Sequence, residues 1–516
     1  MNKNIKRTIT ALVVLSSVAA LGTGCQKSGD RAASGERTKL SFWMQLFSQV
    51  SYSCTNFGET EIAKELQNRL NMDIEFVHPT QGQENEQFNL MIASQELTDI
   101  LFTPATRFKG GVTQAMDDGV IIDLSDYLND KKAPNITRLM KEDKDIDTAI
   151  KLDDGRYCGF PAVASERELR TFKGLIVRKD WLDKLGLPIP ETIDEWETTL
   201  KAFKNDIGAE IPYTFLGSNE FASAFGVARN YYYDVDKKKI TFGGLEPGYK
   251  DFLTTMNKWY SEGLLDSEFA TQNQTIADAK VTSGQTGVIS AAAASGINKY
   301  SVAMADVEGL KWAGAPYPVL RKGETPKYGQ ISEKANPQLF ITSACKDVDS
   351  AVRFLDYGFG EEGHMLYNFG IEGKSYTMEN GYPKYTEDMT DNKEGIPMSN
   401  QLAKYVMSIY GGPFNQDTRY FEQYLKRDEQ KEAIKSWSTI QNSDTLPTLL
   451  LTNEEGEKIA TILTDISKYW NETEFKLIMG KIDMSEYDAC IAKLHEIGID
   501  TVLDVYNNAY ERRYKK

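Results

Sequence analysis

The sequence contains few of the side chains from which catalytic and metal sites are usually built. It has 3 histidines and 5 cysteines in 516 residues, and it lacks the G-x-S-x-G, H-E-x-x-H and P-loop patterns. The last four cysteines, Cys54, Cys158, Cys345 and Cys490, stand more than 100 residues apart, which excludes the close spacing of a zinc site. We expect most of them to be free thiols that fill apolar space. These absences argue against an enzyme, and we expect no cofactor and no metal.

Positive charge is also scarce. Acidic residues outnumber basic ones by 75 to 59, so the net charge is −16, and removing residues 1–24 leaves about −19. Such a surface repels phosphate backbones, and we therefore expect no nucleic-acid partner. This net negative charge favours a neutral or cationic ligand, although the net charge of a protein does not set the sign of the electrostatic potential inside a cleft.

No stretch after residue 24 approaches the roughly 20 apolar residues of a membrane span. Residues 1–24 have the pattern of a signal peptide, with Lys3, Lys6 and Arg7 before a short apolar segment. Residues 21–25 (LGTGC) resemble a bacterial lipobox, in which Cys25 is acylated, for example with palmitate, and becomes the new N-terminus. The alternative is ordinary secretory cleavage.

Residues 26–38 are polar and rich in Gly, Ser and Ala. We expect a flexible tether that spans roughly 20 Å between the lipid and the fold. This arrangement would place the protein on the outer face of the bacterial cytoplasmic membrane.

Hydrophobic periodicity after the tether predicts an α/β fold. Strands are expected at 39–44, 73–77 and 99–103, with helices at 58–70 and 85–96 between them. A strand, helix, strand order requires parallel pairing, because each crossover needs a helix. We expect this first lobe to continue to about Pro161.

A second lobe is expected to begin at Gly174. Residues 175–177 predict a buried strand, and Asp180 is expected to cap the short helix that follows. Thr192 and Glu195 form a capping box for the next helix, whose apolar face includes Trp196. Further strands are expected at 211–216 and 287–290, with a turn at 233–239 and a helix starting within 291–296.

Several stretches resemble one protein family. They are RKDWLDKLGL at 178–187, TIDEW at 192–196, DGRYCGFP at 154–161, the run from Asp356 to Gly373, and YNNAY at 506–510. Together they are similar to the long-chain members of the family 1 extracellular solute-binding proteins, which are lipoprotein receptors of ABC importers, mostly for oligosaccharides.

The resemblance implies a two-lobed, type II periplasmic-binding-protein fold with several crossings between the lobes and a helical C-terminal extension. It implies a first lobe of residues 39–161 plus 318–370, and a second lobe of 162–317 plus 371–516. It also implies a monomeric receptor that captures an oligosaccharide and delivers it to ABC permease subunits driven by a cytoplasmic ATPase. Several relatives carry a calcium loop, but residues 204–210 here offer three oxygen-bearing side chains at most, which is too few.

Candidate ligand-binding residues follow from the expected sheet edges and crossings. Aromatic faces suit sugar rings and planar polar groups suit hydroxyls. Strand ends nominate Trp43, Thr103 and Arg107 in the first lobe and Tyr231 in the second. The crossings and the small-residue segment add Glu166, Arg167, Ser290, Ser295, Tyr317 and Glu372. Each has a structural alternative as a core residue, a hinge brace or a surface charge.

Two other functions remain open at this point. Neighbouring acids such as Asp117 and Asp118 would suit a surface-anchored carbohydrate-active enzyme, although 75 acidic residues make such pairs unavoidable. The second open function is a receptor for a peptide or another solute on the same fold.

Overall fold

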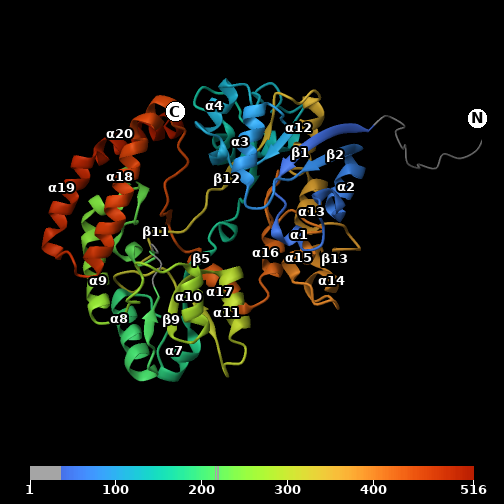
Figure 1. Ribbon diagram of the computed structural model, residues 1–516. Coiled ribbons are helices and arrows are strands. Elements are labelled where there is room, and N and C mark those ends of the chain that lie inside the picture. Colours follow the sequence, from blue (N-terminus) through green and yellow to red (C-terminus); the bar gives the residue numbers. More distant parts are fainter. Residues whose placement is uncertain (1–36, 215–216, 218–219, 516) are drawn as a thin grey trace, which may run out of the picture. The chain divides into compact units, whose positions relative to one another are not determined.

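The computed structural model describes residues 37–214, 217 and 220–515. The expected signal peptide, Cys25 and nearly all of the tether lie outside the described residues, as do positions 215–216 of the expected strand. The part from Thr38 onward is α/β and has two lobes, each with its own sheet and apolar core (Figure 1). Within the described ranges, no helix is long and apolar enough to cross a bilayer.

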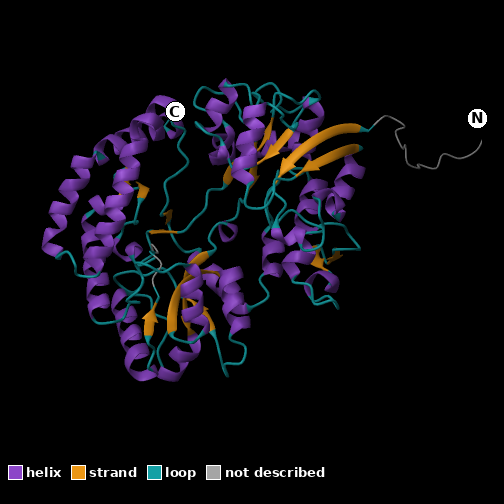
Figure 2. Cartoon of the chain, viewed as in Figure 1, coloured by secondary structure: helices purple, strands orange, loops and turns teal. Residues whose placement is uncertain are grey.

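The first lobe is organised by parallel strands, as its periodicity predicts. Its five-stranded sheet has the order β2-β1-β3-β12-β4, with β1 parallel to β2 and β3 and with β12 antiparallel to β3 and β4. Thr60 caps α2 by accepting a hydrogen bond from the backbone N–H of Ala63, and Ile62, Leu66 and Leu70 are buried. Figure 2 shows β1 and β2 as long arrows side by side. The elements of this lobe are β1 (Thr38–Met44), α1 (Ser48–Ser51), α2 (Glu61–Leu70), β2 (Met72–Val77), α3 (Glu84–Ser94), β3 (Ile100–Phe102), α4 (Gly111–Asp117), α5 (Pro134–Glu142), α6 (Lys144–Ile150), β4 (Phe160–Val163), β12 (Ala335–Ile341), α12 (Val348–Tyr357), α13 (Glu361–Phe369), β13 (Tyr376–Glu379), β14 (Tyr382–Tyr385), α14 (Glu387–Thr390), α15 (Met398–Leu402) and α16 (Thr418–Tyr424).

The second lobe has a four-stranded sheet in the order β10-β5-β9-β6, in which β6 pairs parallel to β9 and the other pairs are antiparallel. A separate hairpin, β7 with β8, contains the expected turn. The long C-terminal helix α18 packs against α9 and α20. The elements are β5 (Lys173–Arg178), α7 (Lys179–Leu185), α8 (Ile193–Ala202), β6 (Ile211–Tyr213), β7 (Tyr231–Asp234), β8 (Lys239–Phe242), α9 (Pro247–Ser261), α10 (Gln274–Thr282), β9 (Thr286–Ala292), α11 (Asn298–Ala303), β10 (Trp312–Gly314), α17 (Asp428–Trp437), α18 (Asn453–Ile478), α19 (Tyr487–Ile497) and α20 (Ile499–Tyr514).

Local predictions in this lobe are confirmed with two exceptions, the cap of α7 and the length of β6, which ends at Tyr213. The capping box of Thr192 and Glu195 is present, and Trp196 is buried. Asp180 does not cap α7; its carboxylate accepts a hydrogen bond of 2.8 Å from the buried guanidinium of Arg178, which needs a charged partner. Strand β9 extends to Ala292, and the expected helix starts at Ala293, within 291–296, as a π-helical turn over Ala293–Ile297 that continues into α11.

The chain crosses between the lobes later than the resemblance implies. Strand β10 pairs with β5, so 312–314 remains in the second lobe, and the return occurs between β11 (Tyr328–Gly329) and β12. Residues after Gly370 also stay with the first lobe: Tyr376, Tyr385 and Tyr420 pack on Phe369. The third crossing therefore lies between α16 and α17, because the tyrosines of this segment complete a first-lobe apolar cluster.

All four described cysteines are free thiols, as expected. Cys158 and Cys345 are buried, and burial raises the pKa of each thiol to about 12. Thiols with such a high pKa stay protonated and are poor nucleophiles.

Candidate binding site

Three neighbouring cavities meet at the crossing segments. Their volumes are about 350, 300 and 210 Å³, and Arg170 and Glu333 contribute to the walls of all three. Arg170 follows the 3₁₀ turn Arg167–Leu169 at the first crossing, and Glu333 precedes β12 at the second. Cavities of about 300–1,000 Å³ are typical of small-molecule sites.

The largest of the three, here called the tyrosine cavity, is lined by aromatic rings from two distant parts of the chain. Tyr233 comes from β7, and Tyr510 and Tyr514 come from the last helix, α20. The rings of Tyr233 and Tyr510 stack with centroids 4.5 Å apart and 22° between their planes, and Tyr514 lies 4.8 Å from Tyr510. An aromatic wall of this kind suits the apolar face of a sugar ring.

Polar groups near the second crossing also line the tyrosine cavity. Gln441, Asn442 and Ser443 belong to the segment that includes β15 (Asn442–Ser443), which pairs parallel with β11. Arg167 fixes this segment by donating to the carbonyl oxygens of Ile440 and Gln441, the latter at 3.1 Å. The crossings therefore bring hydroxyl, amide and guanidinium groups to the cavity together.

Arg170 and Arg167 both bring a guanidinium group to the tyrosine cavity, and Arg170 is the one that also lines the other two cavities. Among the described residues, its half-buried guanidinium has no hydrogen-bond or ion-pair partner, and its Nε is buried. Burial and the neighbouring charge of Arg167 lower the pKa of Arg170 from the usual value of a guanidinium. Glu333 does not neutralise it by contact: its carboxylate accepts hydrogen bonds from the backbone and hydroxyl of Thr448 at 2.6 and 2.5 Å.

The second cavity lies at the edge of the first-lobe sheet where β1 and β3 end. Gln338 in the middle of β12 and Gly411 line it, together with Tyr410, on which the ring of Phe47 stacks at 4.6 Å. Gly411 has a φ of 85°, which favours glycine at this position. Ligands of open α/β sheets bind at such carboxyl edges.

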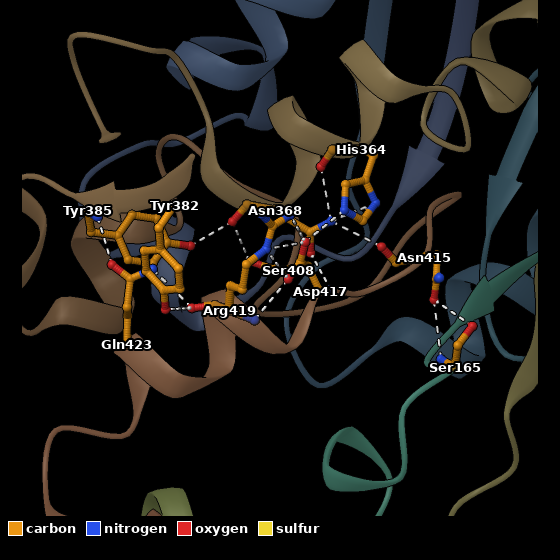
Figure 3. A network of polar contacts seen from close by, with 10 residues as sticks. All are labelled: Ser165, His364, Asn368, Tyr382, Tyr385, Ser408, Asn415, Asp417, Arg419 and Gln423. Carbon is orange, nitrogen blue, oxygen red and sulfur yellow. Dashed lines mark hydrogen bonds and ion pairs between the residues drawn. The ribbon is translucent and has the colours of Figure 1, made fainter. Parts of the chain in front are cut away.

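A buried polar network holds the Gly411 segment in place (Figure 3). Asn368, fully buried in α13, donates to the carbonyl of Asn415, while its own Oδ1 accepts from the backbone N–H of Asp417. His364 and Arg419 both bind the carboxylate of Asp417. Burial would raise the pKa of Asp417, but hydrogen bonds from these two residues lower it below its usual range.

The structure brings Trp43, Thr103 and Arg107 together, as expected, but buries the tryptophan. Trp43 is 3% exposed and packs on Phe88, because both faces of the β1 strand end are covered. The Arg107 guanidinium lies 5.8 Å from the Trp43 ring and donates to Thr103 Oγ1 at 3.0 Å. Trp43 is thus a core residue, and the expectation that its ring faces a cleft is corrected.

Three further candidates are engaged inside the second lobe. Tyr231 packs on Phe242 and Tyr506. Ser290 donates to the buried carboxylate of Glu220. Tyr317 is buried and braces the second crossing, since its hydroxyl donates to Lys173 O and accepts from Gln330 N.

The other candidates lie apart from the tyrosine cavity, except for Arg167. Glu166 is exposed and lines a different cavity of about 780 Å³ between α16 and α17. Ser295 and Glu372 are exposed in turns. Whether any of these residues touches a ligand stays a prediction.

The tyrosine wall is not among the candidates nominated from the sequence, although its signals are present there. Strand alternation puts Tyr231 and Tyr233 on one face, so a choice of Tyr231 also pointed to Tyr233. Tyr506, Tyr510 and Tyr514 recur every four residues along one helix face. The sequence alone does not show that β7 and α20 pack against each other.

No group of three or more His, Cys, Asp or Glu side chains that could hold a metal occurs within the described part of the chain. The three histidines are each engaged locally: His78 with Met44 and Phe57, His364 with Asp417, and His495 with Asp500. The described residues thus present stacked aromatic rings and polar groups around neighbouring cavities.

Comparison with known proteins identifies the family. A sequence model described as bacterial extracellular solute-binding protein matches residues 59–365, more than half of the chain. The chain belongs to this family. Its members and structural relatives are binding proteins.

Individual relatives of this solute-binding protein are similar over most of their length. Lipoprotein LipO of Bacillus subtilis (strain 168) is 24% identical, covering 97% of this chain and 98% of LipO. The fructooligosaccharide ABC transporter substrate-binding protein FusA of Streptococcus pneumoniae serotype 4 (strain ATCC BAA-334 / TIGR4) is 23% identical, covering 83% and 82%. The crystal structure of the alginate-binding protein AlgQ2 without calcium ion superposes with a TM-score of 0.69 at 23% identity, covering 92% and 98%. This last similarity establishes the two-lobed fold.

Proposed function

We propose that this solute-binding protein captures an extracellular oligosaccharide and delivers it to an ABC importer without chemical change. The observation that carries the proposal is the tyrosine cavity, where the stacked rings of Tyr233 and Tyr510 lie beside the guanidinium of Arg170. Aromatic faces with a few convergent polar groups are what sugar recognition requires. The name of FusA, a fructooligosaccharide receptor, supports the same ligand class.

The partners follow from the family. A loaded receptor docks on two permease subunits driven by a cytoplasmic ATPase, and the protein acts as a monomer. Diacylglyceryl modification of Cys25 holds it at the outer face of the membrane, since two acyl chains anchor stably where one binds marginally. The lipoprotein relative LipO supports this anchor.

The ligand contacts proposed are Tyr233, Tyr510, Arg167 and Arg170 in the tyrosine cavity. Arg107 extends the site along the first-lobe sheet edge. Thr103 is buried and holds Arg107 there by accepting its hydrogen bond, while its own backbone N–H donates to Gln338 O at 2.8 Å. A ligand that touches both lobes binds the closed arrangement more tightly than the open one. This difference in affinity shifts the protein toward the closed arrangement.

The test combines binding with product analysis. Purified protein is screened against a panel of oligosaccharides by calorimetric titration, and the recovered sugar is analysed by mass spectrometry. The proposal expects saturable binding of at least one oligosaccharide that is recovered intact. New chain ends would indicate a carbohydrate-active enzyme, and binding of peptides alone would indicate a peptide receptor.

A further inference from the structure

Arg170 occupies a central position in the candidate site. It lies in the wall shared by all three cavities, and it is near the stacked tyrosines of the largest one. Its guanidinium makes no hydrogen bond or ion pair with any other described residue. A partly buried cation without a partner is costly unless something else neutralises it.

The acidic groups around Arg170 are committed elsewhere. Glu333 accepts both of its hydrogen bonds from Thr448. Asp143 and Asp145 both bind the ammonium group of Lys334, at 2.7 and 2.9 Å. Glu166 is exposed and lines the separate cavity between α16 and α17. Asp143, Asp145 and Glu166 favour the charged form of Arg170 through space, but no described carboxylate hydrogen-bonds to its guanidinium, so its N–H donors are available to a ligand.

The chemistry of the side chain selects the ligand group. A guanidinium presents parallel N–H donors in a planar fork, which matches a carboxylate through two hydrogen bonds. The adjoining tyrosine rings suit the face of the sugar that would carry this carboxylate. From this geometry we infer that the ligand is an acidic oligosaccharide, in which a uronic acid carboxylate binds Arg170 while its ring packs on the Tyr233–Tyr510 wall. The inference rests on the proposed function and narrows it to a substrate class.

The experiment compares acidic sugars with their neutral counterparts. A glycan array carrying neutral, uronate, sulfated and phosphorylated oligosaccharides selects the best uronate. This uronate and its methyl ester are then titrated into the full-length mature protein. The ester removes the charge and keeps the ring, so it isolates the carboxylate contact. We expect the uronate to bind at least 10-fold more tightly than the ester.

Three variants assign the contact to Arg170. Arg170→Gln is expected to weaken uronate binding at least 10-fold and to leave ester binding unchanged. Arg170→Lys keeps the charge but not the planar fork, and its affinity for the uronate is expected to lie between those of wild type and Arg170→Gln. Arg138→Gln is the matched control, because Arg138 is an exposed arginine on α5 that pairs with Glu142. Unchanged ester binding also verifies that each variant is folded.

Several results would overturn the inference. If wild type binds the uronate and its ester equally well, or if Arg170→Gln binds the uronate as tightly as wild type does, Arg170 does not bind the carboxylate. The proposed function would still stand. Binding of neutral glycans alone, or of sulfated or phosphorylated glycans without uronates, would likewise overturn the inference and leave the proposed function intact. Failure of every glycan on the array would overturn the proposed function together with the inference.

Discussion

The ring of Tyr233 in β7 stacks on the ring of Tyr510 in α20, with 4.5 Å between their centroids. This pair joins the hairpin of the second lobe to the last helix of the chain. Tyr510 also contacts Tyr514, so the C-terminal helix supplies most of the aromatic wall of the tyrosine cavity. The C-terminal extension is thus part of the candidate site.

Replacement of Tyr510 by alanine is expected to weaken ligand binding roughly 10-fold, or about 1–2 kcal/mol, because the sugar ring loses its stacking face. Isothermal titration calorimetry measures the change. Tyr52→Ala, at a tyrosine that is 58% exposed, serves as the control and should bind normally. Wild-type affinity in Tyr510→Ala would place the ligand elsewhere.

Arg513 joins α20 to the first lobe. It is 8% exposed and donates to the carbonyl oxygens of Thr148 and Lys151 at 2.7 and 3.1 Å, at the end of α6. Arg513→Ala leaves these partly buried acceptors without a charged donor, and we expect a loss of about 2–3 kcal/mol in the free energy of unfolding. Urea denaturation tests this. Lys515 is exposed, and its ammonium group pairs with Glu511 on the same helix end, so the control Lys515→Ala should change stability little.

If Arg513→Ala unfolds at the same urea concentration as wild type, the contact between α20 and α6 does not stabilise the fold. A loss that appears equally in Lys515→Ala would attribute the effect to fraying of the helix end instead.

Asp417 predicts how stability responds to acid. Its pKa is lowered in the folded protein, because hydrogen bonds from His364 and Arg419 outweigh the effect of burial. A carboxyl group whose pKa is lower in the folded than in the unfolded protein stabilises the fold at pH values above its unfolded pKa, which is near 4. This contribution is lost as the pH falls toward the folded pKa. We expect Asp417→Asn to be less stable than wild type at pH 7, and the difference to shrink below pH 4. Chemical denaturation at pH 7, 4 and 3 provides the comparison. A difference that is constant over this range would show that ionisation of Asp417 makes no contribution.

Metal removal is expected to have no effect. Residues 204–210 offer few oxygen ligands, and Phe203–Ile207 form a π-helical turn. Because a ligand stabilises only the state that binds it, EDTA should leave the melting temperature unchanged in differential scanning fluorimetry. A clear drop that calcium restores would reveal a site that this account lacks.

The anchor is tested at Cys25. Cys25→Ala removes the thiol that carries the acyl chains, and the protein should move from the membrane fraction to the medium. Immunoblotting of the two fractions measures the shift, with Cys54→Ala as the control that keeps the lipobox. Retention of Cys25→Ala in the membrane fraction would mean that another segment holds it.

Patterns of local origin could be predicted from the sequence. The alternation of β2, the buried face of α2 and the capping box of α8 depend on neighbouring residues, and each is present. Features that depend on contacts between distant segments of the chain could not be predicted. Trp43 is buried because both faces of β1 are covered, and the third crossing lies after α16 because Tyr420 packs on the Phe369 cluster. The tyrosine wall needs β7 and α20 to meet, which neither segment specifies alone.

The central claim is that this solute-binding protein binds an oligosaccharide in the tyrosine cavity and releases it unchanged. The most direct measurement is calorimetric titration of the selected oligosaccharide into wild type and Tyr510→Ala, followed by mass spectrometry of the recovered sugar. The account predicts saturable binding by wild type, roughly 10-fold weaker binding by the variant, and intact sugar from both. Equal affinities, or sugar recovered in shorter pieces, would contradict it.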